Sequence, residues 1–212
     1  MFSIIVAAGW PIWPLLICSI ISVTLVIERF VSLKTARVLP PHLLNEAMTV
    51  SRSSVPSSDV VLKLEQNSAL GEVLASGFRA INVDARLSED DLRTTMEAAG
   101  RTVAHRLERY LAALATIASA APLLGLLGTV IGMIEIFGSQ APTGGAGAGN
   151  PAQLAHGISI ALYNTAFGLM VAIPTLIFWR YFRTRVDAYL LNLELATERF
   201  ARHLNTLRTR AP

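Results

Sequence analysis

One long part of this chain is almost free of charge. Between Leu111 and Trp179 the only residue with a formal charge is Glu135, and a small Gly-rich polar loop at 138–153 divides this stretch into two apolar runs. Each run is long enough to cross the roughly 30 Å hydrocarbon core of a bilayer. The pattern predicts a helical hairpin in a membrane, where the few remaining polar groups are the first candidates for function.

Composition also favours a membrane protein. Of the 212 residues, 52% are hydrophobic and 16% are charged, whereas soluble domains carry about 25% charged residues. The net charge is +3, and the basic residues lie outside the apolar runs, which favours contact with an anionic leaflet over nucleic-acid binding. Cys18 is the only cysteine, so one chain can form neither a disulfide nor a cysteine-based metal site.

A third apolar run, at 4–27, precedes the other two. A cleaved signal peptide is the alternative interpretation, but the run has no basic start and is long for such a segment, so we expect a retained anchor. Trp10 and Trp13 suit the aromatic belt at one membrane interface. Pro11 and Pro14 lie near the helix start, where a missing N–H costs least.

The basic residues assign a direction to the spans. Arg and Lys follow the first run, precede the second and follow the third, whereas the stretch before Glu28 and the Gly-rich loop contain none. The positive-inside rule therefore places the N-terminus outside. The predicted fold is an all-α membrane protein with three transmembrane helices, the second and third of which extend into a cytoplasmic helical bundle. Its parts are transmembrane helices at 4–27, 111–137 and 156–181, a cytoplasmic helical loop at 28–110, a periplasmic loop at 138–155 and a cytoplasmic helical tail at 182–212.

Local signals predict helices outside the spans. Pro40-Pro41 and a Ser/Pro-rich linker at 51–58 interrupt the cytoplasmic loop, and 68–80 has the pattern of a short amphipathic helix. Ser88, followed by three acids, is typical of a helix start. The periodicity then predicts one helix over 87–137, roughly 75 Å long, with a kink at Pro122. We expect the third helix to continue to about residue 204, in a bundle shaped for self-association.

Small and weakly polar residues line one face of each hairpin helix. Ala121, Gly125, Gly128 and Gly132 recur at helical spacing in the second span, and Gly157, Ala161, Asn164, Gly168 and Ala172 repeat the pattern in the third. Such faces favour close helix packing. Two interpretations remain open for the polar residues there: they bond backbone carbonyls and hold helices together, or they line a polar path. The candidates are Thr129, Ser159, Asn164 and Thr165.

The sequence contains few signals of titrating, metal-binding, catalytic or phosphate-binding groups. Glu135 near the outer end of its helix either extends to the interface or titrates as part of a proton relay, and His156 suits an interfacial polar residue. No His, Cys or acid cluster has metal-ligand spacing, and no catalytic triad or phosphate loop is present. We therefore expect no enzymatic activity, no cofactor and no metal.

Two motifs resemble a known family. Residues 121–132, Ala-Pro-Leu-Leu-Gly-Leu-Leu-Gly-Thr-Val-Ile-Gly, resemble the AP-x-x-GL-x-GTV-x-G signature of the MotA/TolQ/ExbB proton-channel family, and 157–169 resemble its GI-x-x-AL-x-x-TA-x-GL block. MotA-type members have four spans, so three spans favour the ExbB/TolQ branch, with ExbB the more similar.

The resemblance implies a homopentamer in the bacterial inner membrane. Its second and third spans would line a pore that holds an ExbD-like single-span partner with a membrane aspartate, and a TonB-like protein would carry the motion to the outer membrane. The family's pore threonines correspond to Thr129 and Thr165. Ile160 stands where many members carry glutamate, so that carboxylate is not carried over. A TolQ-like role in envelope maintenance and a non-conducting scaffold are the alternatives.

The residues of the spans also favour a partner chain that supplies the titratable group. Proton transfer needs a titratable group or a water chain, and threonine hydroxyls do not titrate in the useful range. Because the spans offer no central ionisable side chain, the chain can line a wet path while another chain brings the carboxylate.

Overall fold

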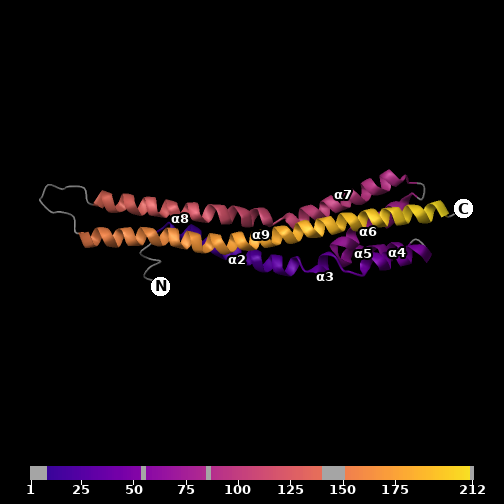
Figure 1. The fold of residues 1–212 in the computed structure, drawn as a ribbon, viewed down its shortest axis with the longest axis horizontal. Coiled ribbons are helices and arrows are strands. Elements are labelled where there is room, and N and C mark those ends of the chain that lie inside the picture. The colour runs from indigo at the N-terminus through magenta and orange to yellow at the C-terminus, as the bar shows by residue number, and fades with distance from the viewer. Residues whose placement is uncertain (1–8, 54–55, 85–86, 140–150, 211–212) are drawn as a thin grey trace. The chain divides into compact units, whose positions relative to one another are not determined.

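The computed structural model describes residues 9–53, 56–84, 87–139 and 151–210. In these ranges the chain forms helices and no strand (Figure 1). The helices are α2 (Ile12–Ser32), α3 (Thr35–Val38), α4 (Leu43–Ser53), α5 (Ser58–Asn67), α6 (Ala69–Val83), α7 (Glu89–Glu108), α8 (Leu111–Ser139) and α9 (Pro151–Arg210).

The chain divides into two compact units. The first unit combines Met1–Glu28 with Tyr110–Tyr181, and the second combines Arg29–Arg109 with Phe182–Pro212. The first unit therefore holds most of α2, all of α8 and the first half of α9. The second unit holds α3 to α7 and the C-terminal half of α9.

Three helical stretches are long and apolar enough to cross a membrane, namely Ile12–Ser32, Glu89–Gly138 and Gly157–Leu207. In the first unit their outward faces are apolar: Ile20 is 67% exposed, Leu123 65% and Met170 66%. Water would make this exposure costly, whereas a bilayer accommodates it. The chain is an all-α, multi-pass membrane protein.

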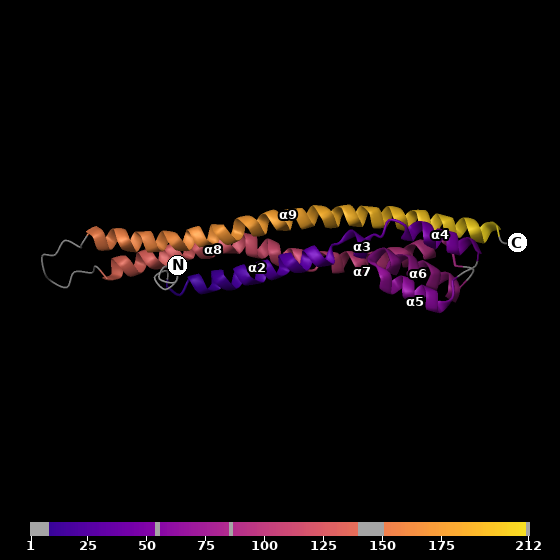
Figure 2. The ribbon, with the colours of Figure 1, turned by 90° about the horizontal axis from the view of Figure 1, so that it is seen from below.

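The core of the first unit is small because its helices pack through small side chains. Leu15 of α2, Ala121 of α8 and Ala172 of α9 form a buried cluster, against which Leu124, Phe167 and Val171 pack. Both ribbon views show α8 and α9 side by side (Figures 1 and 2).

The second unit has a larger apolar core. The face of α6 predicted to be apolar, made of Leu70, Val73, Leu74 and Phe78, is fully buried. Phe78 meets Phe200 of α9 edge to face, with ring centroids 5.0 Å apart, a geometry that aromatic pairs prefer. The C-terminal half of α9 is thus part of the helical unit built by the segment after the first span.

The helix start predicted at Ser88 is confirmed, and Ser68 caps a second helix in the same way. The helix predicted at 68–80 is α6, and the backbone N–H of Gly71 donates to Ser68 Oγ at 3.0 Å. At the start of α7, Asp91 N–H donates to Ser88 Oγ, also at 3.0 Å. Each hydroxyl satisfies one of the backbone donors that a helix start leaves open.

The long helices differ at their ends from the predicted ranges. After a turn at Trp10 and Pro11, α2 begins at Ile12 and continues past residue 27 to Ser32; residues 4–8 lie outside the described residues. Both α8 and α9 extend into the loop predicted at 138–155, of which 140–150 lies outside the described residues. α9 continues beyond residue 204 to Arg210.

The uninterrupted helix predicted over 87–137 needs a correction. α7 ends at Glu108, α8 begins at Leu111, and Arg109 and Tyr110 form a turn between them. Residues 101–121 contain neither Gly nor Pro, so no local breaker explains the turn. Pro122, by contrast, stays inside α8.

Candidate functional site

The two hairpin helices approach closely at a pair of glycines. A Cβ atom added to Gly125 would lie 2.8 Å from the carbonyl oxygen of Asn164, and one added to Gly168 would lie 2.6 Å from the carbonyl oxygen of Ala121. Both neighbours are backbone atoms, which cannot swing aside as a flexible side chain can. The α8–α9 crossing, defined by Gly125 and Gly168, therefore requires residues without a side chain.

The other predicted packing glycines also face the partner helix. A Cβ atom at Gly128 would lie 2.7 Å from Asn164 Cβ, and one at Gly132 would lie 3.2 Å from Ala161 Cβ. A Cβ atom at Gly157 would lie 2.5 Å from Ile136 Cδ1. The small-residue faces thus meet along several turns.

Hydroxyl groups lie at the crossing. Thr165 Oγ1 on α9 donates to the carbonyl oxygen of Gly125 on α8 at 3.3 Å. Thr129 Oγ1 donates to the carbonyl of Leu126 at 2.7 Å. In a regular α-helix the carbonyl of Gly125 also accepts from the N–H of Thr129, so one backbone carbonyl connects the two threonines. Each hydroxyl uses its proton on a carbonyl and keeps lone pairs that can accept a hydrogen bond.

Helical register relates these threonines to the buried cluster around Leu15 of α2. Leu124 and Val171 belong to the packing around Leu15 of α2. At about 100° per residue, Thr129 lies about 140° around α8 from Leu124, and Thr165 lies about 120° around α9 from Val171. Thr129 is therefore turned away from Leu124 and Thr165 from Val171, whereas Ala172 of the same cluster lies within about 20° of Thr165.

The remaining predicted site residues do not share this position. Glu135 is exposed, and its register is close to that of Leu124, about 20° away, so it shares the face of Leu124 and not that of Thr129. Ser159 is exposed, whereas Asn164 is 2% exposed and packs on Gly128. The side chains of His156 and Ile160 lie outside what the structure describes.

Sequence reasoning missed a polar contact between α2 and α9. Thr175 Oγ1 donates to the carbonyl of Val171 at 2.7 Å, so Ser22 donates its own proton to Thr175 Oγ1, at 2.6 Å. Both side chains are buried. A cavity of about 220 Å³ lies beside them, lined mainly by apolar side chains of α2 and α9. The first apolar run contains Ser19, Ser22 and Thr24, so its hydroxyl residues were the available signal.

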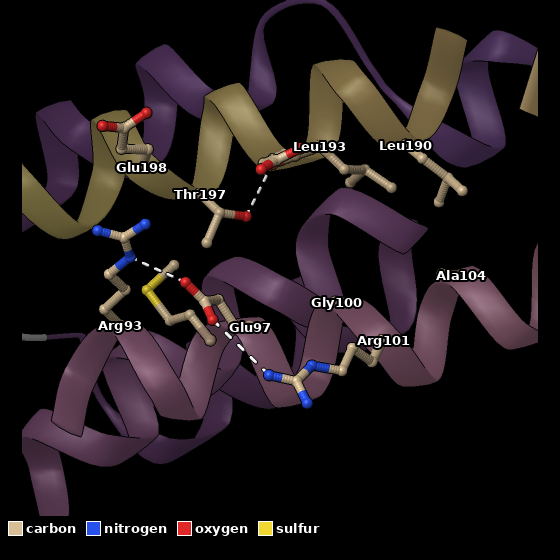
Figure 3. Close-up of a pocket in the computed structure, with 11 residues that line it drawn as sticks. Arg93, Glu97, Gly100, Arg101, Ala104, Leu190, Leu193, Thr197 and Glu198 are labelled. Atoms are coloured by element: carbon tan, nitrogen blue, oxygen red, sulfur yellow. Dashed lines mark hydrogen bonds and ion pairs between the residues drawn. The ribbon is translucent and has the colours of Figure 1, made fainter. Parts of the chain in front are cut away.

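A groove of about 340 Å³ lies in the second unit between α7 and α9. Figure 3 shows Arg93, Glu97 and Arg101 on α7 opposite Leu190, Leu193 and Thr197 on α9. Glu97 accepts from Arg93 at 2.8 Å and lies 3.8 Å from Arg101. The hydrogen bond to Glu97 raises the pKa of Arg93 above its ordinary value, with Glu198 and Asp90 adding to the shift.

Metal chemistry has no site among the described residues. No group of three or more His, Cys, Asp or Glu side chains in that part of the chain could hold a metal ion. The arrangement at the α8–α9 crossing offers hydroxyls and backbone carbonyls, which bind water and pass hydrogen bonds but do not ionise.

These features define a class: a small multi-pass helical membrane protein whose conspicuous polar groups are hydroxyls at a tight helix crossing. Residues 65–195 match the model of the MotA/TolQ/ExbB proton channel family. The chain belongs to that family, and it is ExbB-like.

Curated relatives agree with this assignment. The chain is 34% identical to the biopolymer transport protein ExbB-like 3 of Synechocystis over 178 residues, which is 84% of this chain and 82% of the relative. It is 32% identical to the biopolymer transport protein exbB1 of Vibrio cholerae, over 78% of this chain and 72% of the relative. ExbB of Salmonella typhimurium is 33% identical over 55% of this chain and 54% of that protein.

Proposed function

We propose that this chain is the pore-forming subunit of a proton-driven motor in the bacterial inner membrane, which energises TonB-dependent transport across the outer membrane. Thr129 and Thr165 shape the proton path. The contact that supports this role is the hydrogen bond from Thr165 to the carbonyl of Gly125, because it brings both family-matched threonines to one crossing.

The working form is a homopentamer with a second, single-span subunit. α8 and α9 line the central pore, and the partner, similar to ExbD, supplies a membrane aspartate. Hydroxyls orient water but do not carry a proton by ionising. The chain therefore lines a water-filled path, and a carboxylate from another chain binds and releases the proton. A TonB-like protein receives the motion.

Glu135 and Ile160 are consistent with a carboxylate that another chain supplies. Ile160 occupies the position where many relatives of the family carry glutamate, and Glu135 has the register of Leu124, about 120° around α8 from Thr129. Neither residue places a carboxylate beside Thr129 and Thr165. The names of the curated relatives favour an ExbB-like role over a TolQ-like one.

The test is proton flux in vesicles that contain the chain with its copurified partner. Thr165→Val removes the hydroxyl at the crossing and keeps the shape, so proton-coupled uptake and flux should fall at least tenfold while the complex still assembles. Thr116→Val is the matched control, because Thr116 bonds the carbonyl of Ala112 in the same helix and its register points away from the crossing. It should keep wild-type flux.

The same vesicles test the need for a partner. The chain alone should leave a pH gradient intact, since it lacks the titrating carboxylate. Selective collapse of the gradient by the chain alone, or wild-type flux in Thr165→Val, contradicts the proposal. Absence of flux even with the partner present favours a non-conducting scaffold.

A further inference from the structure

The cavity between α2 and α9 in the first unit has an apolar part and a polar part. Along α2 its lining changes from Ile12, Leu15 and Leu16 to Ser19 and Ser22. The two serines are three positions apart, which places them on one face of the helix. The hydroxyl groups of α2 therefore gather at one end of a cavity of about 220 Å³, and we call this the polar end.

The hydrogen bonds at the polar end use up protons and leave an acceptor. Thr175 donates to the carbonyl of Val171 at 2.7 Å, and Ser22 donates to Thr175 Oγ1 at 2.6 Å. Each hydroxyl has a single proton, so the oxygen of Ser22 keeps two lone pairs that can accept hydrogen bonds. Ser22 is 5% exposed and lines the cavity. A donor inside the cavity can therefore reach this oxygen.

Pro174 supplies a second acceptor beside the same cavity. It lies inside α9, and because proline has no N–H, the carbonyl of Met170 four residues earlier lacks its usual helical donor. Pro174 and Met170 both line the cavity. Within a membrane, such a break in the backbone hydrogen bonds is tolerated where neighbouring hydroxyls or ordered water satisfy it. The cavity thus adjoins a backbone carbonyl that needs a donor.

We propose that the polar end of this cavity is a water-binding site that hydrates the break in α9 at Pro174. Water donates to Ser22 Oγ and to the carbonyl of Met170, and the hydroxyl of Ser19 supplies a third polar group. This set meets the two to four polar partners that a buried water needs, and the cavity is several times larger than the roughly 30 Å³ that one water occupies in the liquid.

The acceptors favour water over a lipid chain at this end. A lipid acyl chain fits the apolar part of the cavity, but it offers no donor to either oxygen, and a buried polar group without a partner is costly. The water site belongs to the contact between α2 and α9. It is independent of the proton path proposed above, so a dry cavity would leave that proposal unaffected.

The test measures water contact in the full-length protein, in bilayers whose lipid acyl chains are deuterated. Water-edited solid-state NMR reports how fast magnetisation from water protons reaches each residue. Ser19 and Ser22 should receive it at least threefold faster than Cys18 and Ile20, which flank Ser19 at the same depth of α2 but do not line the cavity. Equal rates at the four residues overturn the proposal.

Substitutions test the cavity itself. Ser19→Leu fills part of it with apolar atoms, so water transfer to Ser22 should fall at least threefold. Thr24→Leu is the matched control, because Thr24 is exposed, bonds the carbonyl of Ile20 in its own helix and does not line the cavity. It should keep the wild-type rate.

A second variant and a second source of magnetisation complete the test. Pro174→Ala returns an N–H to the carbonyl of Met170 and should also lower water transfer to Ser22, and it replaces Ser19→Leu if that variant fails to fold. With protonated lipids, transfer to Ser22 from acyl chains instead of water identifies a lipid in the cavity. That result, or unchanged water transfer in both variants, overturns the proposal.

Discussion

Gly125 and Gly168 set how closely α8 and α9 approach, because a side chain at either position would meet backbone. We expect Gly125→Ala to destabilise the protein by about 1–3 kcal/mol, the usual cost of overpacking. The reason is the 2.8 Å approach of the added Cβ to the carbonyl oxygen of Asn164. Thermal unfolding in mild detergent measures the change.

Gly138 supplies the control in the same helix. A Cβ atom there has nothing within 4 Å, so Gly138→Ala should be neutral or should stabilise α8 by up to about 1 kcal/mol through helix propensity. Equal destabilisation by Gly125→Ala and Gly138→Ala would show that close packing at the α8–α9 crossing does not cause the loss of stability.

The helix face on which a residue lies could be predicted from the sequence where helical spacing alone determines it. The glycine stripes follow from helical periodicity within one helix, and they do face the neighbouring helix. The acceptor of the Thr165 hydroxyl could not be predicted, because it depends on the register between two helices. The Ser22–Thr175 bond joins positions 153 residues apart, and no periodicity within one helix reports such a pairing.

At the scale of the element, helix starts in the second unit depend on serine caps. Ser88→Ala should destabilise this unit by about 1 kcal/mol, because it removes the acceptor for the N–H of Asp91. Ser57→Ala is a suitable control, since Ser57 occupies the N-cap of α5 without a side-chain cap hydrogen bond. Denaturant unfolding of the two variants, or amide exchange at the first turn of α7, measures the difference. A loss as large in Ser57→Ala would argue against the capping explanation.

Helix existence was more predictable than helix continuity. Hydropathy and caps indicate α6, the start of α7 and the apolar helices, since those signals are local. The turn at Arg109 and Tyr110 has no local signal, and the contact that accompanies it comes from Arg29, 78 positions before its acceptor, the carbonyl of Leu107. Long-range contacts of this kind override local propensity without leaving a mark near the turn.

At the scale of the whole molecule, the composition of the second unit constrains how the chain threads the membrane. This unit combines Arg29–Arg109 with Phe182–Pro212, so both segments must lie on one side of the bilayer. Because the hairpin of α8 and α9 connects them, we expect the connection between these helices on the opposite side. The sequence predicts the same arrangement, because hydropathy and the distribution of Arg and Lys act over whole segments.

The distribution of Arg and Lys then predicts which side of the membrane is cytoplasmic. The second unit contains the chain's Arg and Lys residues that flank the spans apart from Arg180, and the loop at 138–155 contains none, so the second unit should be cytoplasmic. With Cys18→Ser as background, a membrane-impermeant maleimide should label Thr143→Cys in intact spheroplasts and leave Thr94→Cys and Thr206→Cys unlabelled until the membrane is opened. Labelling of Thr94→Cys and Thr206→Cys from outside would reverse the topology. Labelling of only one of these two would separate segments that the fold requires to be together, and would count against the second unit itself.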